Sequence, residues 1–183
     1  MLRAIVAILV LILNLSLSSC ATNVGNLQSY VSPGAGYQFL YPNGWIPVDV
    51  KNATQGVDLV YRDLIERSEN LSVIISDVPD GKTLSDIGTP SDVGYRFFQT
   101  VNNDPNVNRT AELIRADSRE ENGKTYYILE YQVKLPDNTE RHDIASVAVS
   151  RGKLYTFNLS TPEQRWNKVK DTFETAVNSF SVY

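Results

Sequence analysis

Strand-like segments follow one another through the second half of the chain, and only short turns separate them. They cover residues 110–120, 126–135, 143–150 and 154–160. The turn sequences between them are Asn122-Gly123, Pro136-Asp137-Asn138 and Arg151-Gly152. Strands joined by such short hairpins must be antiparallel, because parallel neighbours need a crossover of roughly a dozen residues or more. The sequence therefore predicts an antiparallel meander as the centre of the fold.

The segment from Tyr126 to Leu135 has the clearest alternation in the chain. The apolar set that shares one side is Tyr127, Leu129, Tyr131, Val133 and Leu135. The polar set on the other side is Glu130, Gln132 and Lys134. Side chains alternate across a strand, so we expect one face of the sheet to be core and the other to be wetter.

Two segments have the spacing of amphipathic helices. From Ser91 to Asn102 the apolar residues recur every three or four positions, and Asp104-Pro105 ends the pattern. The second helix follows Thr161, which with Gln164 forms a capping-box pattern around a proline at the first helical position. Its apolar stripe is Trp166, Val169, Phe173, Ala176 and Val177. We expect this helix to lie on the sheet, with residues 180–183 as an edge strand after it.

The first half of the domain gives shorter signals. Strand patterns cover residues 37–41, 57–61 and 71–75, whereas residues 83–88 give no clear assignment. Pro42-Asn43-Gly44 predicts a hairpin or a corner directly before Trp45. Glu66, Arg67 and Glu69 lie in a charged stretch, which we interpret as a solvated loop or, alternatively, as a contact with a partner.

The N-terminus has the pattern of an exported protein. Arg3 precedes an apolar run that is too short to span a bilayer of ~30 Å, as in a signal peptide. Leu17-Ser18-Ser19-Cys20 resembles the lipobox of bacterial lipoproteins, in which the cysteine is acylated and becomes the first residue after cleavage. We therefore predict a signal peptide at 1–19, a lipidated N-terminus at Cys20 with a flexible linker over 20–35, and one domain at 36–183.

Composition excludes several function classes. The formal charge of −4 argues against nucleic acid as a partner, because phosphate binding needs a clustered basic surface. A single cysteine excludes an internal disulfide and a cysteine-cluster metal site. The sequence has no nucleophile elbow, no phosphate-binding glycine loop and no zinc-hydrolase spacing, so we expect no enzyme, although carboxylate pairs leave acid–base chemistry open.

Several short motifs together carry a family resemblance. They are Glu69-Asn70-Leu71-Ser72-Val73, Lys124-Thr125-Tyr126-Tyr127, Gly152-Lys153-Leu154-Tyr155, Arg165-Trp166 and Ser179-Phe180-Ser181-Val182. In this order and spacing they resemble the PsbP family of photosystem II extrinsic proteins, and the lipobox indicates its cyanobacterial, lipid-anchored branch. The resemblance implies an α+β fold, an α/β/α sandwich around a central antiparallel sheet of the PsbP/Mog1-like type.

The resemblance also implies a role. Members of the family are non-enzymatic and act on photosystem II at the lumenal side of the thylakoid membrane. For the lipid-anchored branch this implies a factor that assists assembly or stabilisation of early reaction-centre complexes, with reaction-centre proteins as partners and no required cofactor. A lipoprotein that binds a divalent metal or a small ligand is the alternative. An ion-retention subunit of the oxygen-evolving complex is disfavoured, because the chain has a short polar tether in place of the plant N-terminal extension.

The resemblance points to His142 and Glu163 as metal-binding positions. Imidazole and carboxylate suit Zn²⁺ or Mn²⁺, and Ca²⁺ is a further possible ion for the family. Two ligands do not close a site, since structural zinc normally takes four. Asp143 could be a third ligand, yet adjacent residues of a strand face opposite ways. The alternative is a surface histidine at a strand end that binds zinc adventitiously.

Overall fold

The computed structural model describes residues 26–50, 56–79, 81–102 and 109–183. The strands of the first half are β1 (Leu27–Ser32), β2 (Tyr37–Pro42), β3 (Trp45–Pro47), β4 (Val57–Asp63) and β5 (Asn70–Asp77). The helical elements are α2 (Leu84–Ile87), α3 (Pro90–Asn102), the 3-10 turn η1 (Glu163–Arg165) and α4 (Trp166–Ser179). The strands of the second half are β6 (Thr110–Glu121), β7 (Lys124–Lys134), β8 (Glu140–Ser150), β9 (Lys153–Pro162) and β10 (Ser181–Val182).

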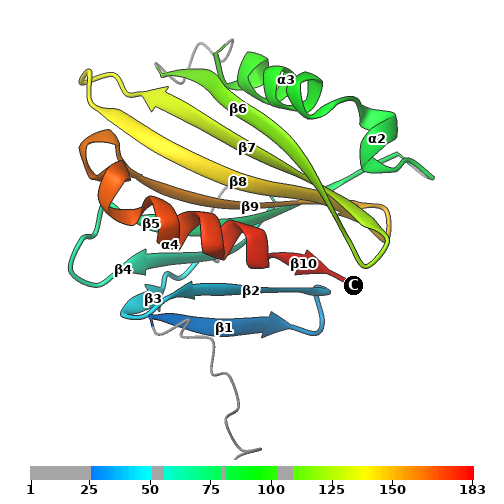
Figure 1. The fold of residues 1–183 in the computed structure, drawn as a ribbon, viewed down its shortest axis with the longest axis horizontal. Helices are drawn as coiled ribbons and strands as arrows, with labels where there is room; N and C mark the ends of the chain where they lie inside the picture. The colour runs from blue at the N-terminus through cyan, green and yellow to red at the C-terminus, as the bar shows by residue number, and fades with distance from the viewer. Residues whose placement is uncertain (1–25, 51–55, 80, 103–108) are drawn as a thin grey trace, which may run out of the picture.

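A seven-stranded antiparallel sheet forms the middle layer. Its order is β3-β4-β5-β9-β8-β7-β6, so the four strands of the predicted meander are neighbours in chain order. Helix α4 lies along one face of this sheet, and α3 lies on the other (Figure 1). A small sheet of order β1-β2-β10 lies beside α4. The architecture confirms the α+β class and the α/β/α layers, and adds a second sheet to them.

Each face of the large sheet carries its own hydrophobic core. The core under α4 and the small sheet is rich in aromatic rings, and Phe39 stacks on Phe157 with their centroids 4.4 Å apart. The core under α2 and α3 includes Leu84, Val93 and Phe98. Strand β7 therefore has no wet face along its middle, and the predicted wetter side is wrong there. Glu130 is only 7% exposed because α4 covers the side on which it lies.

The linker predicted to reach residue 35 is wrong from Leu27 onward. Residues 27–32 form β1, which pairs with β2 in antiparallel register. Tyr30 stacks on Phe39 at 5.1 Å, so the strand contributes to the first core. The stretch is mostly polar and therefore lacks the apolar alternation that predicts a strand. An edge strand with one half-buried side needs few apolar positions. Cys20 and the predicted signal peptide lie outside the described residues.

The predicted start of the last helix is also wrong, although its apolar stripe is confirmed. Thr161 and Pro162 are the final residues of β9, and α4 begins at Trp166 with no side-chain cap. The Thr161 hydroxyl instead donates to Glu69 Oε1 at 3.1 Å. In this fold the threonine is fully buried, so pairing a buried carboxylate takes precedence over capping a helix.

The interpretation of the charged stretch as a solvated loop is wrong at Glu69, which is 4% exposed because Arg165 and Thr161 bond its carboxylate inside the fold. The other local predictions hold, with one shift. The turn at Asn43-Gly44 is a corner that passes the chain from the small sheet into the large one. Residues 181–182 form the edge strand β10. Helix α3 begins at Pro90, just before the predicted start, because Thr89 and Asp92 bond each other's backbone N–H groups as a capping box. Over the described ranges, no helix combines the length and apolarity needed to cross a membrane.

Candidate functional site

The sole histidine of the sequence lies in a buried ionic cluster. His142 comes from β8 and is 4% exposed, so its interpretation as a surface residue is wrong. Its Nδ1 atom lies 2.9 Å from Glu163 Oε2, and its Nε2 atom lies 2.9 Å from Glu130 Oε1. The structure thus brings together the two residues that the resemblance paired, and adds Glu130 from β7.

Trp166, the first residue of α4, covers the histidine ring. The two rings are stacked, with centroids 3.8 Å apart and planes 11° from parallel. Trp166 in turn meets Phe173 edge-on at 6.3 Å, which joins the cluster to the aromatic core. A flat ring over the imidazole leaves only its edges for hydrogen bonds, and carboxylates occupy both edges.

Each edge of the His142 ring meets one acidic side chain. A carboxyl oxygen lies 2.9 Å from each ring nitrogen, which is hydrogen-bonding distance. Glu130 comes from β7 and Glu163 from η1, so the ring joins two separate elements across β8. His142 therefore bridges the two glutamates inside the fold.

Further polar side chains extend the cluster on both sides. Arg115 Nε donates to Glu130 Oε2 at 3.0 Å, and its Nη2 lies 3.4 Å from Glu174 Oε1 on α4. On the other side, Gln132 Nε2 lies 3.3 Å from Glu163 Oε2. The buried carboxylate of Glu130 thus faces Arg115 and His142, while the half-exposed Glu163 reaches the surface.

A second buried carboxylate lies at the same end of α4. Glu69 is 4% exposed, and it accepts from Arg165 Nε at 2.6 Å and from Thr161 Oγ1 at 3.1 Å. The hydrogen bond to Glu69 raises the pKa of Arg165. Arg141 Nη2 donates to the carbonyl of Ser68 at 2.7 Å, which ties the loop between β4 and β5 to β8.

The residues present do not fit a closed metal site. The carboxylates of Glu130 and Glu163 approach opposite edges of the imidazole, so a single cation cannot contact both of them and the ring. A tetrahedral zinc site needs four ligands at about 2.0–2.3 Å, which this arrangement does not offer. Within the described ranges, no group of three histidine, cysteine, aspartate or glutamate side chains is arranged to hold an ion. The geometry fits an internal ion bridge better than a metal centre.

Asp143, the possible third ligand, faces the opposite side of the sheet. Its Oδ1 accepts from Asn158 Nδ2 at 3.0 Å, on the face that α3 covers. Burial raises the pKa of Asp143 above its ordinary value, because the charged carboxylate loses its hydration there. The strand alternation used in the sequence argument is confirmed by this placement.

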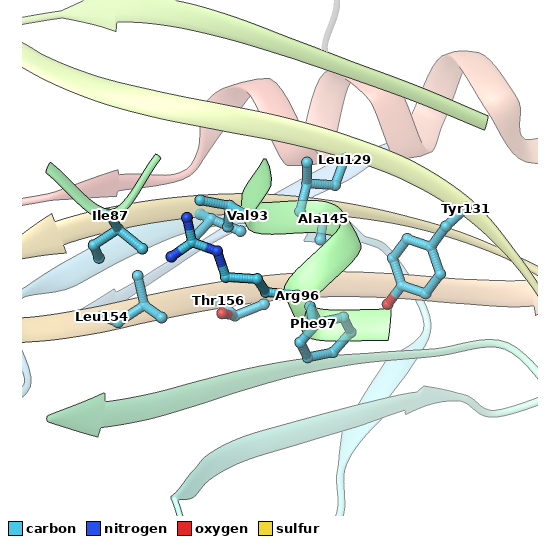
Figure 2. A pocket seen from close by; sticks show the side chains of 10 residues that line it. Ile87, Val93, Arg96, Phe97, Leu129, Tyr131, Ala145, Leu154 and Thr156 are labelled. Atoms are coloured by element: carbon cyan, nitrogen blue, oxygen red, sulfur yellow. The ribbon is translucent and has the colours of Figure 1, made fainter. Parts of the chain in front are cut away.

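An apolar pocket of about 260 Å³ lies between α3 and the sheet. Arg96 and Phe97 of α3 border it on one side, and Leu154 and Thr156 of β9 border it on the other (Figure 2). Tyr131 lines it as well, and also lines a second hollow that contains Asp143. The sequence analysis missed this pocket, because spacing along a helix does not show how much of a sheet the helix leaves uncovered.

We predict that His142→Ala weakens the fold. The substitution removes the ring between the two glutamates and leaves Glu130, which is buried, with Arg115 alone. Leaving a buried polar group without one of its hydrogen-bond partners costs about 1–3 kcal/mol, and the loss of the buried ring adds a cavity. Urea unfolding followed by tryptophan fluorescence measures the loss, and Trp166 reports directly from the cluster.

Glu140→Ala is the matched control. Glu140 is an exposed acid at the same end of β8, and its change should stay within about 0.5 kcal/mol. A chelator added to the wild-type chain should leave the unfolding midpoint unchanged. If His142→Ala were as stable as Glu140→Ala, or if the chelator lowered the midpoint, the ion bridge would not be the structural element described above.

We predict that Asp143→Asn changes how stability depends on pH. The folded-state pKa of Asp143 is raised above its ordinary value, so the folded state holds the proton more tightly than the unfolded state. The stability that this proton contributes is fully present below the unfolded-state pKa and is lost as pH rises through the folded-state pKa. A tenfold difference in proton affinity between the two states corresponds to about 1.4 kcal/mol. The free energy of unfolding of Asp143→Asn, relative to wild type, should rise as pH increases from about 4.

Asp137→Asn provides a control of opposite sign. A hydrogen bond from the Thr139 side chain lowers the pKa of Asp137, so wild type gains stability from it above the ordinary aspartate range. Unfolding of both variants and wild type over a series of pH values separates the two effects. A difference between Asp143→Asn and wild type that stays constant with pH would contradict a raised pKa at this position.

Comparison with known proteins places the chain in a family. A family model described as PsbP matches residues 25–182. CyanoP from Synechocystis sp. is 56% identical over 179 residues, which are 97% of this chain and 95% of that protein. CyanoP from Thermosynechococcus vestitus is 46% identical over 171 residues, which are 91% of each chain.

Solved structures agree with this assignment. The solution structure of CyanoP from Synechocystis sp. has a TM-score of 0.76 at 58% identity and covers 92% of this chain and 99% of that one. The Saccharomyces cerevisiae Ran-binding protein Mog1p has a TM-score of 0.56 at 10% identity, covers 86% of this chain and 95% of that one, and is similar in fold alone. The predicted PsbP/Mog1-like fold is confirmed. By its matched length and its identity to CyanoP, the chain belongs to the PsbP family.

Proposed function

We propose that this protein is a lipid-anchored accessory factor of photosystem II on the lumenal side of the thylakoid membrane. It assists assembly or stabilisation of early reaction-centre complexes by contact with their proteins, and it catalyses no reaction. The observation that carries this proposal is the PsbP match over residues 25–182, together with the identity to CyanoP over almost the whole chain. Cys20 supplies the membrane anchor in this proposal.

The chemistry of the cluster supports a role without catalysis. A general base must reach a substrate proton with a free lone pair. Both ring nitrogens of His142 face carboxylates, and Trp166 covers the ring, so the imidazole serves the fold. Glu163 is partly exposed, and its Oε2 atom already faces His142 and Gln132. No cofactor is needed for this role.

The test is affinity purification of a C-terminally tagged chain from solubilised thylakoids, followed by native gels and identification of the proteins that copurify. We expect early reaction-centre complexes to be enriched over an untagged strain. Recovery with mature oxygen-evolving complexes would replace the assembly role by a stabilising one. A sample with no enriched photosystem II protein would refute the proposal.

Cys20→Ala is the matched variant for this experiment. It keeps the domain intact and removes the one thiol that can be acylated. We expect it to lose labelling by radioactive fatty acid and to yield fewer reaction-centre proteins per tagged chain. Normal lipid labelling of this variant would refute the anchor.

A lipoprotein that binds a small ligand is the second candidate, and the pocket favours it. A dry cavity of about 150 Å³ lined by apolar side chains can hold a benzene-sized molecule, and this pocket is larger. Its floor is apolar, whereas the adjoining hollow holds Asp143 and Asn158. The chemistry suits an amphipathic molecule with an apolar body and a hydrogen-bonding head.

Ala145→Leu tests this second function, because Ala145 lines the pocket and is buried. The probe is a fluorescent apolar dye, 1-anilinonaphthalene-8-sulfonate, titrated into the folded chain. We expect wild type to bind it and Ala145→Leu to bind at least several-fold more weakly. Equal binding by both, with both chains shown to be folded by circular dichroism, would exclude the pocket as the dye site.

A further inference from the structure

Leu64 and Ile65 form an apolar projection on the loop between β4 and β5. Their exposed fractions are 55% and 94%, and Ile65 is the most exposed of the large apolar side chains in the described residues. The two residues are adjacent in sequence, whereas scattered single apolar residues on a surface need no explanation. We name this pair the Leu64–Ile65 tip.

The exposure of the tip is built into the loop. Asp63 Oδ1 accepts from the backbone N–H of Ile65 at 2.7 Å and from that of Glu66 at 2.6 Å. The N–H of Leu64 donates to the carbonyl of Gly44 at 3.2 Å. These hydrogen bonds hold the backbone in a turn that directs both apolar side chains outward. The chain thus uses polar contacts to present apolar surface.

The charges around the tip are arranged asymmetrically. The carboxylate of Asp63 accepts hydrogen bonds from the backbone of the turn. The carboxylate of Glu66 accepts from the Ser68 hydroxyl, and its Oε2 atom lies 3.5 Å from Arg165 Nη1. Arg62 and Arg67, which flank the tip in sequence, are exposed. An apolar projection beside exposed basic residues suits the interface of an anionic bilayer, where the side chains enter and the cations meet headgroups.

The tip lies close to the point where the N-terminal segment joins the domain. The N–H of Asn43 donates to the carbonyl of Asn26 at 2.9 Å, and the next residue, Gly44, accepts from Leu64. The beginning of β1, strand β3 and the loop between β4 and β5 lie at one edge of the fold (Figure 1). Cys20 precedes Asn26 by six residues, a stretch of at most roughly 20 Å when fully extended.

We propose that the Leu64–Ile65 tip inserts into the interfacial layer of the bilayer that holds the acylated Cys20. This inference rests on the lipid anchor of the proposed function and adds a second membrane contact to it. A net charge of −4 gives the chain no long-range attraction to anionic lipid, so the anchor must first bring the tip to the surface. Two contact points, unlike one, fix the orientation of the domain.

The orientation follows from the strand order. The tip belongs to the end of the large sheet formed by β3 and β4, and β6 is the opposite edge strand. With the tip in the bilayer, β6 and the adjacent helix α3 are held away from the membrane. Those elements are then available to a protein that extends from the membrane into the aqueous space.

The experiment uses the full chain, acylated in a bacterial host and reconstituted into vesicles of phosphatidylcholine and phosphatidylglycerol in equal parts. Ile65→Cys receives an environment-sensitive fluorophore, and Ile114→Cys, at an exposed isoleucine of β6, is the matched control. Acylated Cys20 has no free thiol, so only the introduced cysteine is labelled. Spin-labelled lipids should quench the probe at position 65 at least several-fold more than the probe at position 114.

Flotation of the vesicles separates the two proposals. A chain that floats but shows equal quenching at both positions refutes the tip contact and leaves the anchor intact. A chain that does not float refutes the anchor, and the tip contact with it, because no other attraction brings the domain to the bilayer. In thylakoids, a photoreactive group at position 65 should label lipid; labelling of a photosystem polypeptide in its place would assign the tip to a protein partner and overturn the inference.

Discussion

The fold depends on pairing the charges that the large sheet buries beneath α4. Glu130, His142 and Glu69 are each less than 10% exposed, at 7%, 4% and 4%. A buried polar or charged group without a partner costs several kcal/mol, so the partners of these three residues must come together from β6, β7, β8, β9 and η1. This requirement explains how α4 begins without a side-chain cap: Trp166 stacks on His142, and Arg165 bonds Glu69.

Buried ion pairs are weak evidence for stability, because well-packed apolar residues of the same volume often do as well. What they supply here is a unique arrangement of distant segments. Arg165 reaches Glu69 and Glu66 at once, and Arg141 holds the carbonyl of Ser68. The start of α4 therefore positions the whole loop between β4 and β5. These contacts tie the loop that carries the apolar tip to η1 and β8.

The sequence predicted the elements that follow from a periodic pattern of apolar residues. It did not predict which faces of those elements other parts of the fold cover. The meander and the stripe of α4 follow from local patterns, and both are present. The burial of Glu130 could not be predicted, because alternation separates two faces of a strand without showing which helix covers each. Thr161 has a capping-box sequence, yet its hydroxyl donates to the buried carboxylate of Glu69, which lies 92 residues earlier in the chain. The pairing of His142 with Glu163 came from family resemblance, and no spacing rule would have found it.

An interior role for the cluster restricts where partners can bind. His142 and Trp166 are buried, so contact with another protein has to use the outer surface of the domain. Aromatic side chains dominate the binding energy of most interfaces. On α3, Tyr95 and Phe97 are 61% and 42% exposed. A domain tethered at Cys20 and oriented by the Leu64–Ile65 tip would present α3 to a membrane complex beside it. The proposed anchor, the tip contact and the accessory role are therefore compatible with a single orientation of the domain.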